Sequence, residues 1–236
     1  MTLDKVLKDR TLPGSIFGGV QDFYSQKFRL DAVLIQNTEM FEQLKPRLKN
    51  QVLDCIFKKQ YSRFNFAFEG CDVKFMREIF CNTQFHYVVP ETEKDREQFK
   101  TMALPRWMKD NEEPIIEQAG NIPSNVYFII SGQIHLMNKD GLYEYAILSE
   151  GSYFGDISLL LDQPEEFSYF YNPYHEKPIL MLTVNAEKFT QICDSYPLSR
   201  EVLSQRAREK KQIFQNYKTV TLIKYMRTII KNPNVL

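Results

Sequence analysis

The stretch from Gly151 to Phe167, GSYFGDISLLLDQPEEF, has the composition of a ligand-binding loop. Its first half combines glycines with a short apolar run, and such a backbone can make a tight turn whose amide N–H groups point at an anion. Its second half places Glu165 and Glu166 side by side. The segment therefore joins the backbone of an anion cradle to two charges that repel an anion.

The cysteines and histidines are not spaced like metal ligands. The four cysteines form no C-x-x-C pair, and the three histidines are far apart in the sequence. This distribution favours buried structural thiols in a reducing compartment over a metal or redox site. Because no nucleophile with a neighbouring base emerges either, we expect a binding protein and not an enzyme.

The overall composition is that of an ordinary globular protein. The chain has 236 residues, of which 43% are hydrophobic and 25% are charged, enough for one domain of good size or two small ones. Its 30 basic and 30 acidic residues balance, which excludes a global basic field that would attract nucleic acid. No apolar run approaches the roughly 18 to 20 residues that span a bilayer, and the polar start does not resemble a signal peptide, so we expect a soluble chain.

Apolar periodicity predicts helices at both ends of the chain. From Leu3 to about Ile79 apolar residues recur every three or four positions, as on a one-faced helix. Pro46 suits the first turn of one helix, and Asp72 can cap another. From Ala186 a short helix is followed by a long one, for which we expect Ser199 to be the cap.

After Phe85 the period changes to two, which indicates strands. The runs share β-rich composition and are separated by Gly, Pro, Asn and Asp turns: FHYVVP, EPIIEQAG, NVYFIISGQIHLMN, YEYAILSEGSYFG and KPILMLTVN. This spacing is typical of an antiparallel sandwich or barrel. Asp140 and Gly141 match a type I′ hairpin turn. The charged residues 91–113 interrupt the strands and are interpreted as an insertion.

The order of these elements resembles the cyclic-nucleotide-binding domain, preceded by the C-linker of cyclic-nucleotide-gated, hyperpolarisation-activated and ether-à-go-go type channels. Four motifs carry the resemblance in order: LPGSIFGGVQDFYSQKF, LKNQVLDCIFKKQYSRFNFAFEGCDVKFMREI, VYFIISGQIHLM and GSYFGDISLLL. It implies an α+β fold, with a helical C-linker, an antiparallel β-roll (jelly roll), a short cassette helix and C-terminal helices. The implied boundaries are 1–66 for the C-linker, 67–217 for the β-roll domain with its insertion, and 218–236 for a basic amphipathic helix.

In such domains the loop after the sixth strand holds the cyclic phosphate, an acid takes the ribose hydroxyl, and an arginine nine positions later neutralises the phosphate. The residues that fall in this cassette are Phe154, Gly155, Asp156, Ile157 and Ser158. Nine positions after Asp156 stands Glu165 in place of the arginine, followed by Glu166 and Phe167. Repulsion in place of attraction changes the interaction by several kcal/mol, since one pair about 4 Å apart contributes about 4 kcal/mol at an effective dielectric of 20. We therefore expect weak or absent binding of cAMP and cGMP.

Two residues of the long final helix fall where relatives contact the base from above, namely Lys210 and Phe214. Both could be lid contacts; alternatively, Lys210 is solvated and Phe214 packs on the roll. An ether-à-go-go-like pocket, empty or filled by the protein's own side chains, would suit Phe167.

The resemblance implies a non-enzymatic regulatory or gating module on the cytoplasmic side of a membrane. The parent would be a cation channel, potassium-selective or non-selective, whose C-linkers form a tetrameric ring beneath the transmembrane domain. We expect no cofactor, although cAMP or cGMP could act as a ligand. Two alternatives stay open: a true cAMP or cGMP sensor with non-standard phosphate contacts, and the same module in a sodium/proton exchanger or a ciliary scaffold protein.

The C-terminal segment offers a further interaction surface. Residues 205–236 carry eight Lys or Arg against one acid. A basic amphipathic helix of this kind could bind a calmodulin-like or otherwise acidic partner, or a membrane surface; alternatively, it packs on its own domain or on a neighbouring subunit. No nucleic-acid partner is expected.

Overall fold

The computed structural model describes residues 25, 41, 43–88, 115–172 and 179–231. The helices predicted before residue 40 and the 91–113 insertion lie outside the described residues. The described helices are α5 (Pro46–Arg63), α6 (Asn65–Phe68), α7 (Val73–Cys81), α9 (Asp156–Leu161), α10 (Ala186–Ser195) and α11 (Pro197–Lys231). The described strands are β1 (Gln84–Val88), β2 (Ile115–Glu117), β3 (Asn125–Ser131), β4 (Ile134–Met137), β5 (Glu144–Leu148), β6 (Tyr153–Phe154), β7 (Ser168–Tyr171) and β8 (Ile179–Asn185).

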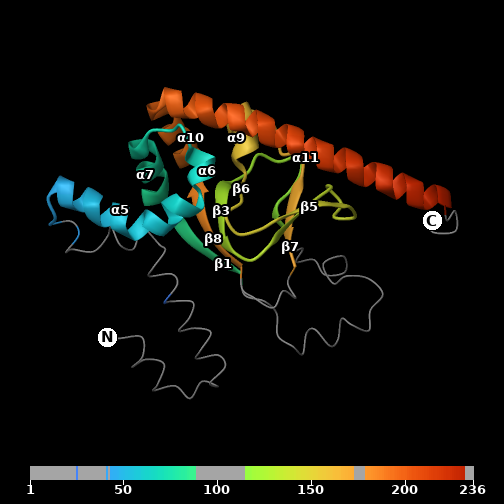
Figure 1. The fold of residues 1–236 in the computed structure, drawn as a ribbon, viewed down its shortest axis with the longest axis horizontal. Helices are drawn as coiled ribbons and strands as arrows, with labels where there is room; N and C mark the ends of the chain where they lie inside the picture. Colours follow the sequence, from blue (N-terminus) through green and yellow to red (C-terminus); the bar gives the residue numbers. More distant parts are fainter. Residues whose placement is uncertain (1–24, 26–40, 42, 89–114, 173–178, 232–236) are drawn as a thin grey trace, which may run out of the picture.

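Two antiparallel sheets form the β-roll. Their strand orders are β1-β8-β3-β6 and β2-β7-β4-β5, which confirms the predicted α+β fold (Figure 1). The sequence runs identified as strands omitted β7. Because β7 lies between β2 and β4 and buries Ser168, Tyr169 and Phe170 in succession, both of its faces are covered and it lacks the polar alternation that marks a half-exposed strand.

The turn between β4 and β5 differs from the prediction. A type I′ turn needs positive φ at both central residues, yet Asp162 alone among the described non-glycine residues has positive φ, so Asp140 does not. Asn138 closes the turn instead. Its carbonyl accepts the Gly141 N–H at 3.0 Å and its side-chain oxygen accepts the Tyr143 N–H at 2.8 Å.

Two of the three predicted helix starts are confirmed by the structure. Pro46 opens α5, and the Asp72 side chain caps α7 by accepting the Lys74 N–H at 2.7 Å. The prediction for Ser199 is wrong. The helix begins at Pro197, which needs no N–H in the first turn, and the Ser199 hydroxyl accepts the Asp72 N–H at 3.0 Å, linking α11 to α7.

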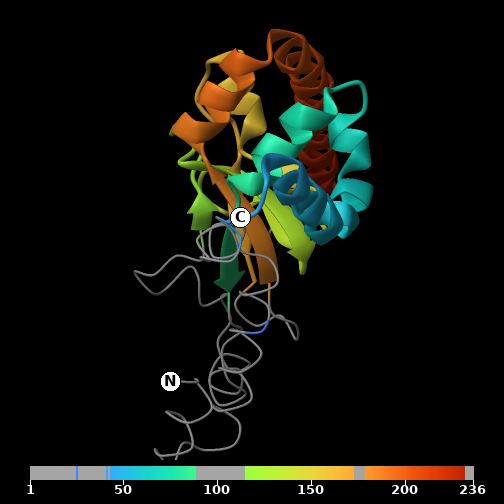
Figure 2. The same ribbon diagram turned by 90° about the vertical axis from the view of Figure 1, so that its left-hand side faces the viewer.

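Strand β3 separates two apolar cores. Its residues Val126, Phe128 and Ile130 pack into the core that helices α5, α6, α7 and α10 cover. The alternate residues Tyr127 and Ile129 face the interior of the roll. Figure 2, seen from the α5 side, shows this helical layer in front of the strands. The cassette residues Phe154 and Ile157 belong to the second core, inside the roll.

Helix α11 lies across the roll and extends beyond it (Figure 1). Three buried residues of α11 recur on one face, namely Leu203, Ala207 and Phe214. Lys210 belongs to the same stripe, three residues after Ala207 and four before Phe214, where an apolar residue would complete the pattern. The helix continues without a break past residue 217, so the predicted segment 218–236 begins inside α11.

Candidate functional site

The turn between β6 and α9 depends on a glycine. Gly155 has φ of 85°, and a Cβ there would lie 2.4 Å from the Asn125 carbonyl oxygen, so both conformation and space exclude other residues. The preceding Phe154 is fully buried. Its ring is stacked between those of Tyr127 and Tyr169, with centroids 4.7 and 4.4 Å away. The cassette backbone is therefore held between a tight turn and an aromatic stack.

The acid that opens α9 is bound by α11. Asp156 is 3% exposed, and its Oδ1 forms an ion pair with the Lys210 ammonium. That ammonium also donates to the Tyr153 carbonyl at 3.3 Å and lies 3.8 Å from the centre of the Tyr153 ring. Burial lowers the pKa of Lys210, and Asp156 opposes this effect. The alternative of a solvated Lys210 is wrong, because only 16% of the side chain is exposed.

Glu165, at the arginine position of the family pattern, is buried without an ion-pair partner among the described residues. Its Oε2 accepts a long hydrogen bond of 3.4 Å from the Tyr169 hydroxyl. Neither Glu165 Oε1 nor the nearby Ser158 Oγ has a well-formed partner in the described part of the chain. Burial raises the pKa of Glu165 to about 7, and Asp156 adds to the rise, whereas Ser158, Lys210 and Tyr169 oppose it. The acid is therefore uncharged below about pH 7 and repels a phosphate fully only above it.

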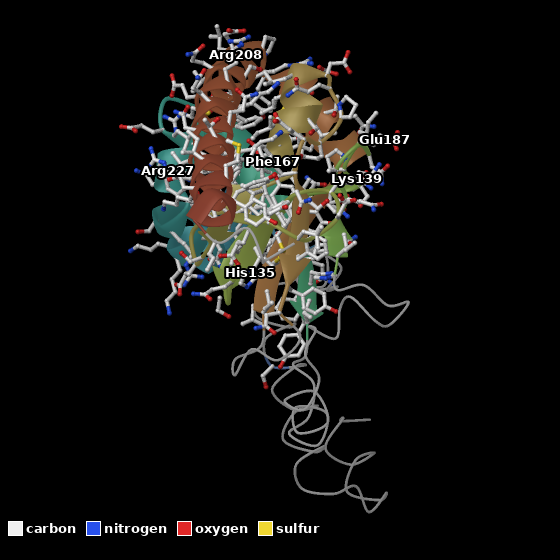
Figure 3. All side chains as sticks on the ribbon, turned by 90° about the vertical axis from the view of Figure 1, so that its right-hand side faces the viewer. His135, Lys139, Phe167, Glu187, Arg208 and Arg227 are labelled. Atoms are coloured by element: carbon white, nitrogen blue, oxygen red, sulfur yellow. The ribbon has the colours of Figure 1, made fainter. Side chains whose placement is uncertain are left out.

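Two aromatic rings fill the space between the roll and α11. Phe167 and Phe214 are 2% and 5% exposed, and their ring centroids lie 5.9 Å apart at 87°. Phe167 also contacts Tyr145 edge-on at 5.7 Å. Figure 3 shows Phe167 between α11 and the strands. Phe214 therefore packs on the roll, as one of the two alternatives predicted.

A more exposed set of contacts surrounds these rings. Glu166 accepts hydrogen bonds from Lys218 at 2.9 Å and from Gln215 at 3.2 Å. Partial burial acts to raise the pKa of Glu166, but the two donors outweigh it and lower the pKa overall. The Lys211 ammonium donates to the Gln163 side chain at 2.8 Å. These contacts hold α11 to the loop that follows α9.

The four cysteines form no disulfide in the described part of the chain. The prediction of buried thiols is right for Cys193 and wrong for the exposed Cys55, while Cys71 and Cys81 are half-buried. Among the described residues, no three His, Cys, Asp or Glu side chains come together as a metal site. The helices in that part of the chain include none with the length and apolarity of a membrane span.

Comparison with known proteins finds similarity in the middle of the chain. Residues 110–196 match the family model of the cyclic nucleotide-binding domain. The cyclic nucleotide-gated channel alpha-4 proteins of Mus musculus and Rattus norvegicus are each 24% identical over 141 residues. This similarity covers 60% of the present chain and 20% of each relative. The chain thus spans about a fifth of the length of the curated relatives that it matches.

The predicted site residues come together where the cassette and the loop after α9 meet α11. They are Phe154 to Ser158, Glu165 to Phe167, Lys210 and Phe214. Sequence reasoning missed three of their partners. Lys218 could have been found, because it lies one helical turn after Phe214 on the same face. Tyr153 and Tyr169 could not, because their roles depend on how the strands and α11 meet in space.

Proposed function

We propose that this chain is a regulatory module of a cation channel, with a cyclic-nucleotide-binding fold that closes on its own side chains. The observation that carries this proposal is the double contact of α11 with the cassette. Lys210 pairs with Asp156, and Phe214 packs on Phe167. A nucleotide between the roll and α11 would have to displace both contacts, so its binding energy would be reduced by their loss.

The charge of the cassette region also opposes nucleotide binding. A phosphate in the cassette would meet Glu165 where the family pattern has an arginine. A carboxylate about 4 Å from the phosphate would cost about 4 kcal/mol at an effective dielectric of 20, and the protonated acid would still supply no positive charge. Because each 1.4 kcal/mol changes affinity tenfold, we propose that cAMP and cGMP bind weakly or not at all.

The channel assignment is supported by the distant similarity to cyclic nucleotide-gated channel alpha-4. The helices before the roll resemble the C-linker of such channels. We therefore propose that the module acts on the cytoplasmic side of a membrane, in a tetramer, by passing movements of α11 through these helices to a pore. A six-helix channel region with a pore loop encoded upstream in the same gene would support this, whereas exchanger helices would favour the alternative parent.

Isothermal titration calorimetry with cAMP and cGMP tests the nucleotide part of the proposal. We expect negligible heat for the native chain. The double variant Glu165→Arg, Phe167→Ala supplies a cation and removes the ring, and it should gain measurable binding. Glu187→Arg, the same charge change at an exposed site on α10, is the matched control and should gain none. Micromolar binding by the native chain would refute the proposal.

One observation favours the alternative of a sensor with non-standard phosphate contacts. Helix α11 directs Lys210, Lys211 and Lys218 at the cassette and its loop, and these ammonium groups could exchange their present partners for a phosphate. In that case the native chain would bind nucleotide, and Lys210→Met or Lys218→Met would abolish the heat. The same titration therefore separates the two functions.

A further inference from the structure

The surroundings of the Lys210 ammonium are those of a cation-binding site. It meets the Asp156 carboxylate, the Tyr153 carbonyl oxygen at 3.3 Å and the face of the Tyr153 ring at 3.8 Å. A carboxylate, a carbonyl dipole and a π face all attract a cation. Asp156 is 3% and Tyr153 is 9% exposed. The site is therefore built from groups held inside the protein.

A second carboxyl group reinforces this preference. Glu165 lies close enough to raise the pKa of Lys210, and it is itself 4% exposed. Its Oε1 and the Ser158 Oγ, which is also buried, lack hydrogen-bond partners among the described residues. The pocket thus contains oxygen acceptors beyond those that the Lys210 ammonium contacts.

The position of Lys210 in α11 suggests that its ammonium group is bound specifically by the cassette. It stands in the buried stripe between Ala207 and Phe214, where an apolar side chain would pack without the cost of desolvating a charge. Asp156 in turn is a buried carboxylate that needs a counter-ion at this place. The burial of Lys210 and the burial of Asp156 are each compensated by the opposite charge of the other.

We propose that the cassette is a binding site for a primary alkylammonium group, with the Lys210 side chain as its resident occupant. The pocket that takes an anionic phosphate in the family pattern has become a cation site in this chain. A free primary amine of matching length takes the same place when the Lys210 side chain is removed. This goes beyond the proposed function and does not depend on it, because it concerns the ligand class of the pocket and not the parent protein.

The test is rescue of Lys210→Ala by n-propylammonium chloride, followed by thermal unfolding. The substitution removes three methylenes and the ammonium, which propylammonium replaces. We expect the variant to unfold at a lower temperature than the native chain and the amine to raise that temperature. At an amine concentration about ten times its dissociation constant, the ratio of folded to unfolded protein should rise about 11-fold. Potassium chloride and 1-propanol at equal concentration should give no such rise.

Two further variants locate the effect. Asp156→Asn combined with Lys210→Ala removes the carboxylate and should abolish the amine response. Lys211→Ala deletes a neighbouring lysine that donates to Gln163, and it should show no response specific to the amine. Rescue that persists without Asp156, or that 1-propanol reproduces, would refute the site.

If Lys210→Ala does not fold by itself, its refolding yield in propylammonium against potassium chloride gives the same readout. A higher yield in the amine supports the site, and an equal yield refutes it. The amine experiments test the ammonium site, and the nucleotide titrations of the native chain test the proposed function. Either proposal can therefore be refuted without affecting the other.

Discussion

The segment from α9 to the start of β7 buries one acid at each end, and the two acids have different kinds of partner. Asp156 at the start of α9 is paired with Lys210 from the distant helix α11. Glu165 at the far end has a long hydrogen bond to Tyr169 and no ion pair among the described residues. Its pKa rises to about 7 as a result of burial. The comparison shows that two buried acids near the same ammonium can differ in their partners, because Lys210 contacts Asp156 directly and acts on Glu165 without forming an ion pair with it.

The largest expected effect comes from removing the cation that distinguishes the two ends. Lys210→Met keeps most of the side-chain volume but leaves Asp156 as an uncompensated buried charge. We expect a loss of about 3 kcal/mol in the free energy of unfolding, the lower end of the range for breaking a buried pair, because Lys210 keeps some exposure. Urea denaturation at pH 7 measures it.

The control for this change is the double variant Asp156→Asn, Lys210→Met. It removes both charges and should recover much of the loss. A single-variant loss below about 1 kcal/mol would mean that the pair behaves like a surface salt bridge and that the two ends do not differ.

The second effect concerns the unpaired end and depends on pH. The pKa of Glu165 is raised from 4.5 to about 7, so between these values the folded chain keeps a proton that the unfolded chain has lost. Stability should therefore fall as pH rises through this window, by about 3 kcal/mol in total. Glu165→Gln should abolish that part of the pH dependence and be more stable than the native chain at pH 8. Urea denaturation at pH 5 and pH 8 checks both statements.

Glu166 provides the matched control of opposite sign. Its pKa is lowered by Lys218 and Gln215, so its contribution is present above the ordinary pKa of a glutamate and is lost as pH falls through the lowered value. Glu166→Gln should therefore slightly destabilise the chain at neutral pH. If both substitutions had the same sign at pH 8, the distinction between a buried unpaired acid and a paired one would fail.

The smallest effect is expected for the more exposed ion pair between α11 and the loop after α9. Lys218 and Glu166 form an ion pair with side chains 38% and 31% exposed. Lys218→Met should change the free energy of unfolding by at most about 1 kcal/mol, and less in 1 M salt, because solvent and ions screen the pair. Denaturation curves at low and high salt measure the difference. A loss as large as that of Lys210→Met would show that exposure does not separate the two lysines.

Much of the fold followed from local patterns in the sequence. Pro46 and Asp72 marked helix starts correctly because each acts on the backbone within a few residues. The change of apolar period from about 3.6 to two separated the helices from the roll. Strand β7 was missed because its two covered faces remove the period on which strand prediction depends.

The candidate site was only partly predictable. The family pattern drew attention to the cassette and to the acid at Glu165, and it indicated Lys210 and Phe214 on the final helix. It left open whether Lys210 is solvated. That question depends on the rotation of α11 about its axis, which many contacts along the roll decide together.

Local patterns were enough to give most of the helix and strand segments, the tight turn at Gly155, and the absence of an arginine nine positions after Asp156. Which charges meet depends on the fold as a whole. Lys210 lies 54 positions from Asp156, so their pairing depends on how α11 packs on the roll. Asp156 therefore gains its counter-ion only when α11 packs, because no residue close to it in the sequence supplies a cation.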